Sequence, residues 1–227
     1  NSGKVSLLVR ICCFFLSRRV FFIVHGWSYT GLLKSPSRFL FLIVEFIFEL
    51  IDWPFCVKVF VSNYDKKNRP IRILNIFNKR SFVIQNGAKD YSSIQIKNSS
   101  KKRKNTSIIK RELRLLTVAR LTAQKDIPSL LMSLTFNSNV HLTIVGDGHQ
   151  MRKLKKLAKK LEISQRVSFL GSLSPVYIYE QYRLCDIFIL VSNWEGFPIA
   201  SLEALSFSKP VIVSDVGGAA ELFEAES

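Results

Sequence analysis

The sequence has few acidic residues, no apolar run long enough to cross a bilayer and no cysteine pattern of the metal-binding kind. Its 33 lysines and arginines outnumber 17 aspartates and glutamates, for a formal net charge of +16. This balance favours phosphates, acidic lipid head groups or nucleic acid as partners. Hydrophobic residues make up 48% of the 227 positions, which argues against a disordered chain and supplies a core for one large or two small domains.

The four cysteines offer neither a metal site nor an evident disulfide. Cys12 and Cys13 are adjacent, whereas Cys56 and Cys185 lie inside apolar runs. Adjacent cysteines rarely join separate parts of a fold, and none of the spacings suits a metal. We therefore expect all four to be reduced core residues of a cytoplasmic protein.

Of two apolar stretches in the first quarter of the chain, Phe39–Ile51 is too short to span a membrane. Val5–Leu16 is interrupted by Arg10 and has no small-residue cleavage site, so it does not resemble a signal peptide. Phe39–Ile51 carries Glu45 and Glu49 on one side. This pattern predicts a helix with a narrow polar stripe, which favours a helix buried in the core over one lying on a membrane surface.

Short apolar runs rich in β-branched or aromatic residues recur along the chain, and each ends in glycine or small polar residues. Such runs are typical of parallel strands buried on both faces. Helical patterns lie between many of them, so the sequence predicts a doubly wound α/β fold, most regular from about Leu113 onward. The predicted strands are Val20–Val24, Val57–Val61, Phe82–Ile84, Leu115–Ala119, His141–Val145, Val167–Leu170, Ile187–Val191 and Val211–Val213. The predicted helices are Ile127–Leu134, Met151–Leu161 and Pro198–Phe207.

A basic segment of low hydrophobicity divides the chain. Asn98–Lys110 contains the run Lys101-Lys102-Arg103-Lys104, which fits a solvated linker better than a patch that binds nucleic acid or lipid. We expect an N-terminal domain over residues 1–97, a linker over residues 98–112 and a C-terminal domain over residues 113–227.

The stretch Ser192–Leu205 carries the clearest chemical signal. A loop with Glu195 and Gly196 follows a predicted strand, and a helix is expected to begin near Pro198. The free N–H groups of such a helix end can hold a diphosphate. Glu195 and Glu203 could then bracket a nucleoside diphosphate sugar, one facing the sugar and the other accepting hydrogen bonds from ribose hydroxyls. The alternative is a generic strand–loop–helix with two surface glutamates.

This stretch resembles the Glu-x7-Glu motif of the family 4 (group 1) retaining glycosyltransferases of the GT-B fold. The flanking residues make the resemblance specific: Glu-Gly-Phe-Pro over 195–198, Leu-Glu-Ala-Leu over 202–205, Lys209–Gly218 and Glu221-Leu222. The resemblance implies an α/β fold of GT-B type, with two Rossmann-like domains that contain parallel sheets. The family's first strands and Gly-rich loop have no counterpart before Val20, so we expect the N-terminal domain to be incomplete and the C-terminal one to lack its last elements.

Arg120 and Lys125 match the family's Arg…Lys pair. Two cations at a strand end can neutralise the donor diphosphate and the charge that grows on it as the glycosidic bond breaks. Taken singly, either residue could be an ordinary surface cation. Family members usually have glycine after this lysine, whereas Asp126 stands here and could cap the helix that begins at Ile127.

Two further motifs follow the family's order along the chain. Gly146-Asp147-Gly148 resembles the Gly-x-Gly turn that approaches the nucleotide base or ribose, although such a turn also simply connects a strand to a helix. Val24–Trp27 resembles the His-Gly motif, in which the imidazole, here His25, could bond a sugar hydroxyl or a phosphate oxygen. The alternative for His25 is a histidine that satisfies a turn.

The resemblance implies a hexosyltransferase that retains anomeric configuration and moves the sugar from a UDP- or GDP-linked donor to a hydroxyl acceptor. It implies no metal or other cofactor, and the sequence has no Asp-x-Asp cluster placed to hold a divalent ion. Glu195 is expected to position the donor rather than to form a covalent bond. The expected catalytic residues are His25, Arg120, Lys125 and Glu195, and the expected donor-binding residues are Gly146, Gly148, Gly196, Phe197, Pro198, Ile199 and Glu203.

Trp27–Thr30 looks like members that build bacterial surface or capsular polysaccharides. Their acceptor would be a saccharide or a lipid-linked sugar at the inner face of the cytoplasmic membrane, and the basic charge fits peripheral contact with anionic lipid. One alternative is an inactive fragment that at most binds nucleotide. Another is a nucleic-acid binder, but the basic residues are spread over helices and a linker without a reader motif, so nucleic acid is not an expected partner.

Overall fold

The computed structural model describes residues 20–25, 56–67, 81–89 and 112–223, together with the single positions 12, 15, 43 and 47. These residues form two compact units. The first contains the described residues up to Asn86, the loop Trp194–Phe197 and the residues from Gly217 on. The second contains the described residues from Gly87 to Asn193 and the segment Pro198–Val216.

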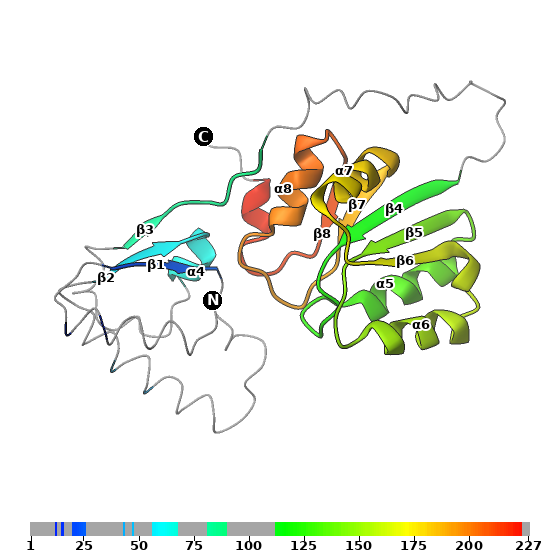
Figure 1. The fold of residues 1–227 in the computed structure, drawn as a ribbon, viewed down its shortest axis with the longest axis horizontal. Helices are drawn as coiled ribbons and strands as arrows, with labels where there is room; N and C mark the ends of the chain where they lie inside the picture. The colour runs from blue at the N-terminus through cyan, green and yellow to red at the C-terminus, as the bar shows by residue number, and fades with distance from the viewer. Residues whose placement is uncertain are drawn as a thin grey trace. The chain divides into compact units, whose positions relative to one another are not determined.

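The second unit is built on a five-stranded parallel sheet in the order β6-β5-β4-β7-β8 (Figure 1). The earliest strand, β4, lies in the centre, and the chain adds strands first on one side of it and then on the other. Open α/β sheets bind ligands at such a reversal, beyond the carboxyl ends of the strands. The strands are β4 (Leu113–Val118), β5 (Val140–Val145), β6 (Val167–Gly171), β7 (Ile187–Leu190) and β8 (Val211–Val213).

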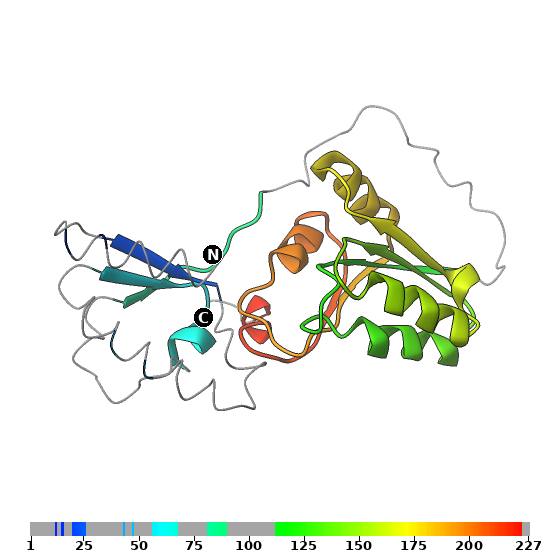
Figure 2. The same cartoon turned by 60° about the horizontal axis from the view of Figure 1, so that its bottom comes forward.

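Helices cover both faces of this sheet, α5 and α6 on one face and α7 and α8 on the other (Figures 1 and 2). Each face of the sheet therefore has its own hydrophobic core. Successive residues of β4 point to opposite faces: Leu115 packs toward α5 and α6, and Leu116 packs toward α7 and α8. Burial on both faces explains why the strands are almost continuously apolar. The helices are α5 (Ile127–Ser133), α6 (Met151–Lys160), α7 (Pro175–Leu184) and α8 (Ile199–Ser206), with short 3-10 turns η2 (Leu134–Phe136) and η3 (Ser164–Arg166).

The first unit contains a three-stranded parallel sheet in the order β1-β2-β3. Val24 and Phe60 are buried in its described core, with Phe22 and Val83 packed against them. The described elements are β1 (Val20–Val24), β2 (Cys56–Phe60), α4 (Asn63–Lys67), β3 (Ser81–Val83) and the 3-10 turn η4 (Ala220–Leu222).

The predicted strands and helices agree with the observed ones to within two residues at each end. Pro198, predicted to begin a helix, is the N-cap of α8. Helix α7 is not evident from the sequence, because its first turns over Pro175–Tyr179 are rich in aromatic and β-branched residues that favour strands. Packing favours the helix there, since Ile178 and Tyr179 pack against the core that buries Tyr182 and Cys185 later in α7 and at its end.

Several predictions about the first part of the chain are corrected or lie outside the described residues. Cys185 is free and buried as predicted, but Cys12 is exposed, so a core position is wrong for it. Of the helix predicted over Phe39–Ile51, only Ile43 and Ile47 are described. Both are helical, but their side chains are 40% and 46% exposed, so the predicted burial is wrong at these positions. The basic linker is outside the described residues except at its last position, 112.

Within the described ranges, no helix combines the length and the apolar character needed to cross a bilayer.

Candidate functional site

The loops that follow β4 and β5 meet at the carboxyl edge of the second unit's sheet. The Ala119 N–H donates to the Val145 carbonyl at 2.9 Å, and the Leu121 N–H donates to the Asp147 carbonyl at 2.9 Å. Arg120 lies between these two bonded residues, and its side chain is exposed. The predicted cation is therefore held by a rigid backbone at the edge where open α/β sheets bind their ligands.

The Gly-x-Gly turn after β5 requires glycine because its backbone lies close to the backbone of the loop after β4. Gly146 has a φ of +125°, and a Cβ atom on it would collide with the carbonyl oxygen of Ala119. A Cβ atom on Gly148 would collide with the carbonyl oxygen of Leu121. Only glycine lets the two backbones lie this close. The structure thus gives both glycines a packing role, and their contact with a nucleotide stays a prediction.

The loop after β4 is also joined to the start of the loop after β7. The side-chain amide of Asn193 donates to the Ala123 carbonyl at 2.8 Å, and its backbone N–H donates to the Gln124 carbonyl at 2.8 Å. Lys125, the next residue along, is half-buried. Sequence reasoning assigned no role to Asn193, although a polar residue shortly after a buried strand is well placed to join two loops.

Asp126 caps α5, which is what the sequence suggested for a residue in place of the family's usual glycine. Its Oδ2 atom accepts a hydrogen bond from the Ser129 hydroxyl at 2.6 Å, and its Oδ1 atom accepts one from the Ser129 N–H at 3.4 Å. Both oxygens are therefore engaged in the cap, which draws the carboxylate toward the helix that it begins.

The N-terminus of α8 has backbone N–H groups without a backbone acceptor in the part of the chain that the structure describes. Pro198 is the N-cap in an extended conformation, and its carbonyl accepts hydrogen bonds from the N–H groups of Ser201 and Leu202. Within the described residues, the N–H groups of Ile199 and Ala200 have no backbone acceptor. Two unpaired donors at the positive end of a helix form a suitable cradle for a phosphate group.

Glu203 lies one turn further along α8 and is half-buried. Its Oε2 atom accepts a hydrogen bond from the hydroxyl of Tyr182 on α7 at 3.0 Å. Sequence reasoning missed Tyr182, because the hydroxyl lies on the face of a helix that the sequence did not reveal.

The first unit brings the predicted His25 and Glu195 segments together. The ideal Cβ position on Gly196 lies 2.6 Å from the carbonyl oxygen of His25, which is closer than any real side chain allows. On its other side the loop meets a glycine pair: the Gly218 N–H donates to the Glu195 carbonyl at 3.3 Å, and a Cβ atom on Gly217 would collide with that carbonyl oxygen. His25 is exposed and Glu195 is half-buried.

A profile of the family described as glycosyl transferases group 1 matches residues 98–227. The chain belongs to this family. Among curated relatives of this group 1 chain, the O-antigen biosynthesis glycosyltransferase WbnH of Escherichia coli is 32% identical over 228 residues, which cover 99% of the chain and 59% of the relative. The alpha-monoglucosyldiacylglycerol synthase of Streptococcus pneumoniae is 29% identical over 194 residues, covering 80% of the chain and 41% of the relative. The chain thus spans about six-tenths of the length of WbnH.

Solved structures show that this group 1 chain has the GT-B type of α/β fold. The Anabaena protein HepE, crystallised with UDP and glucose, superposes with a TM-score of 0.76 at 20% identity, over 99% of the chain and 60% of HepE. WaaG, described as a glycosyltransferase involved in lipopolysaccharide biosynthesis, superposes with a TM-score of 0.65 at 19% identity, over 90% of the chain and 59% of WaaG.

The predicted site residues of this group 1 chain are divided between the two units, so the joint action of Glu195 and Glu203 on one ligand stays a proposal. The second unit brings its own candidates to one edge of one sheet, and the first unit brings its candidates to one loop cluster. The second unit holds Arg120, Lys125, Gly146, Gly148, Pro198, Ile199 and Glu203, and the first holds His25, Glu195, Gly196 and Phe197.

A second residue that sequence reasoning left without a role is Glu221, which is 9% exposed. Its carboxylate accepts hydrogen bonds from the N–H groups of Asn63 at 2.8 Å and Tyr64 at 2.7 Å, and from the side-chain amides of Asn63 and Gln85 at 3.3 Å each. These bonds join the segment after Gly217 to the first residues of α4 and to the segment after β3. The pair Glu221-Leu222 is among the family residues identified in the sequence. The sequence therefore indicated that Glu221 matters, but it did not show which residues Glu221 bonds.

Proposed function

We propose that the protein is a retaining glycosyltransferase that moves a hexose from a nucleoside diphosphate sugar to a hydroxyl group in polysaccharide or glycolipid synthesis. The observation that carries the proposal is that the open N-terminus of α8 and the loop that holds Arg120 and Lys125 occur at the same edge of the sheet. This end of α8 and that loop follow the adjacent strands β7 and β4, so they share one edge of the sheet. Two cations and two unpaired N–H donors at one edge match the charge of a diphosphate.

The second unit supplies the donor-binding groups in this proposal. Arg120, Lys125 and the N-terminus of α8 bind the diphosphate. They also stabilise the negative charge that the diphosphate gains as its bond to the sugar breaks. Glu203 accepts hydrogen bonds from the ribose hydroxyls. The turn at Gly146 and Gly148 lies beneath the nucleoside. The positive charge comes from the protein, so the proposal invokes no metal and no other cofactor.

The first unit supplies the groups that act at the sugar. Glu195 positions the transferred hexose by accepting hydrogen bonds from its hydroxyls, and the loop through Gly196 and Phe197 holds that carboxylate in place. His25 bonds a sugar hydroxyl or a phosphate oxygen as a neutral imidazole. The close packing of Gly196 on the His25 carbonyl supports this shared role, because it keeps both side chains on one rigid cluster.

UDP is the first donor nucleotide to test, since HepE was crystallised with it, and GDP is the alternative. The names of WbnH and of the glucosyldiacylglycerol synthase support a saccharide or lipid-linked acceptor. We place the protein in the cytoplasm, in peripheral contact with the inner face of the membrane.

UDP is expected to stabilise the chain against unfolding, by about 2.7 kcal/mol at one hundred times its dissociation constant. Glu203→Ala should lower the UDP affinity by about tenfold or more, because a carboxylate that accepts hydrogen bonds from a ligand typically contributes about 1.5–3 kcal/mol. Thermal unfolding with increasing UDP, GDP and their hexose conjugates measures both effects.

The matched control is Glu180→Ala, which removes an exposed glutamate from α7 in the same unit and should leave the UDP affinity unchanged. Equal affinity in the Glu203 and Glu180 variants would contradict the assigned role of Glu203. UDP binding without release of UDP from UDP-hexose in the presence of acceptors would favour the alternative of an inactive nucleotide-binding chain.

The exposed face of α6 gives the proposed membrane contact a defined surface. Six cationic side chains are exposed along it, and the helix has no acidic residue. Each such charge near an anionic membrane contributes about 1 kcal/mol. We therefore expect binding to vesicles with 30% phosphatidylglycerol, measured by co-sedimentation at low salt, to fall at least about tenfold when three lysines become glutamine. The residues concerned are Lys153, Lys156 and Lys160.

Replacing the same three lysines by arginine keeps the charge and should preserve the binding. Co-sedimentation that does not depend on the anionic lipid would remove the membrane contact from the proposal. Equal losses in the glutamine and arginine variants would show that charge on α6 is not what the membrane recognises.

A further inference from the structure

Tyr182 has an unusual position for a polar side chain. It is fully buried at the centre of the core between α7, α8 and the sheet. Its ring stacks on Phe207 with centroids 5.5 Å apart and packs against Phe188 at 5.6 Å. A phenylalanine would make the same ring contacts, so packing alone does not account for the hydroxyl.

The hydroxyl reaches two oxygens of α8. It lies 3.0 Å from Glu203 Oε2 and 2.9 Å from the Ala200 carbonyl oxygen. The two acceptors are three residues apart and therefore lie on one face of α8. Among the described residues, the other carboxylate oxygen of Glu203, Oε1, has no hydrogen-bond partner. One oxygen of Glu203 is thus held from inside the core, and the other makes no hydrogen bond to the described residues.

The hydroxyl remains a donor across the pH range. Burial, and then the charge of the Glu203 carboxylate, raise the pKa of Tyr182 far above its usual value. Its proton is therefore always present, and a hydrogen bond to a carboxylate is roughly twice as strong as one between neutral groups.

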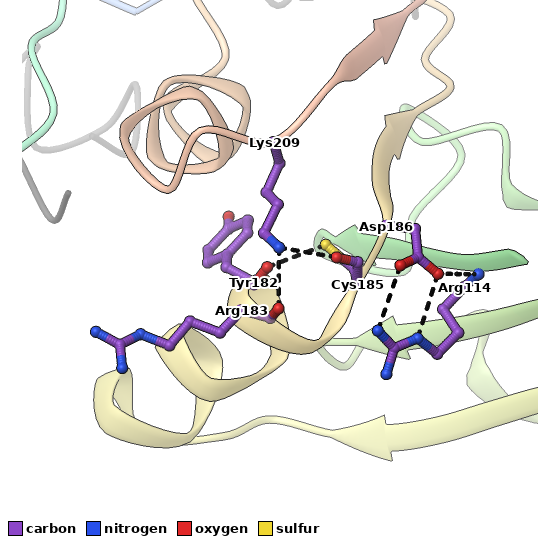
Figure 3. A network of polar contacts seen from close by, with 6 residues as sticks. All are labelled: Arg114, Tyr182, Arg183, Cys185, Asp186 and Lys209. Atoms are coloured by element: carbon purple, nitrogen blue, oxygen red, sulfur yellow. Dashed lines mark hydrogen bonds and ion pairs between the residues drawn. The ribbon is translucent and has the colours of Figure 1, made fainter. Parts of the chain in front are cut away.

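Tyr182 is also prevented from moving away, because the end of α7 is fixed on both sides (Figure 3). The Lys209 ammonium donates to the carbonyls of Arg183 and Cys185 at 2.9 Å each, which ties α7 to the start of β8. Asp186, just beyond α7, accepts hydrogen bonds from the Arg114 N–H at 3.0 Å and from its guanidinium at 3.3 and 3.4 Å, which ties the same end to β4.

We propose that Tyr182 is a positioning residue for nucleotide binding: its hydroxyl holds Oε2 of Glu203 so that Oε1 is aimed at the ribose hydroxyls of the nucleotide. The inference rests on the proposed function, since it needs a nucleotide at the α8 end. A glutamate that is free to rotate gives up conformational freedom when it binds a ligand, whereas a glutamate that is already held gives up little.

The test is a double-mutant cycle on UDP affinity, measured by calorimetry. Tyr182→Phe should weaken UDP binding by about tenfold, the effect of one hydrogen bond to a charged group. In the Glu203→Ala background the same substitution should change the affinity by less than about twofold, because nothing is left to position. A merely structural role for Tyr182 would weaken binding equally in both backgrounds, and that outcome would overturn the proposal.

The control variant is Tyr177→Phe, which removes an exposed hydroxyl from the same helix and should leave UDP affinity unchanged. A second readout needs no ligand: 13C relaxation of the Glu203 carboxylate in the free protein should show a more mobile side chain in Tyr182→Phe and no change in Tyr177→Phe. An unchanged Glu203 signal in Tyr182→Phe would overturn the positioning role by itself. A different result would count against the proposed function instead: the unsubstituted chain does not bind UDP, while Tyr182→Phe still makes the Glu203 side chain more mobile.

Discussion

Replacing Arg120 by alanine is expected to lower kcat/KM for sugar transfer by about 10²–10³, the usual effect of removing one group that stabilises charge in the transition state. Arg120 is exposed at the carboxyl edge of the sheet, between two backbone hydrogen bonds that fix its loop. Its guanidinium can meet the diphosphate in the ground state and more strongly as the leaving oxygen becomes charged. UDP affinity should therefore fall less than kcat/KM, by about tenfold, and both are measured on the same preparation.

Arg152→Ala is the matched control, because it removes an exposed arginine from α6 in the same unit and changes the net charge equally. It should leave transfer within about twofold of the unsubstituted protein, and neither variant should shift the unfolding temperature appreciably. Equal losses in the two variants would mean that general charge, rather than a phosphate contact of Arg120, supports activity.

Gly146→Ala is expected to destabilise the second unit by at least about 3 kcal/mol. Two causes act together: a φ of +125° is strained for any L side chain, and the added Cβ would collide with the carbonyl oxygen of Ala119. The Ala119 carbonyl cannot move easily, because the Ala119 N–H is bonded to Val145. Urea unfolding followed by tryptophan fluorescence or circular dichroism measures the loss.

A substitution at Gly171 is the control that tests backbone strain without a collision. Gly171 lies at the end of the neighbouring strand with a φ of +70°, and among the described residues no atom beyond its chain neighbours lies within 4 Å of its Cβ position. Gly171→Ala should therefore cost only the backbone strain of a left-handed residue, about 1–2 kcal/mol. If both substitutions cost the same, the contact between the loops after β4 and β5 does not constrain the turn, and the rigid support proposed for Arg120 is lost with it.

Much of the candidate site was accessible from the sequence because its signals are local. The end of a buried strand, the proline before a helix and the flanking Glu-Gly-Phe-Pro mark the α8 end without any tertiary information. Asp126 could be recognised as a helix cap for the same reason, since the residue that it bonds is only three positions away. Each of these features depends on residues within one turn or one loop.

The partners of the site residues were not accessible, because they come from distant parts of the chain. Tyr182 meets Glu203 across 21 positions, and Glu221 meets Asn63 across 158. The helix that carries Tyr182 has a first turn with strand-like composition, so even its secondary structure depended on burial. No spacing rule connects these residues, since tertiary packing within the second unit joins Tyr182 to Glu203 and packing within the first unit joins Asn63 to Glu221.

The sequence by itself determined the α/β alternation, the order of the strands along the chain and the chemical character of the α8 loop, because periodicity and helix-end preferences are properties of neighbouring residues. Only the tertiary structure decided that the two loop glycines serve backbone contact, that one oxygen of Glu203 is held from the core and that Ile43, Ile47 and Cys12 are exposed. Burial and close approach are set by which elements pack together, and a linear pattern of apolar residues cannot show which of its faces finds a partner.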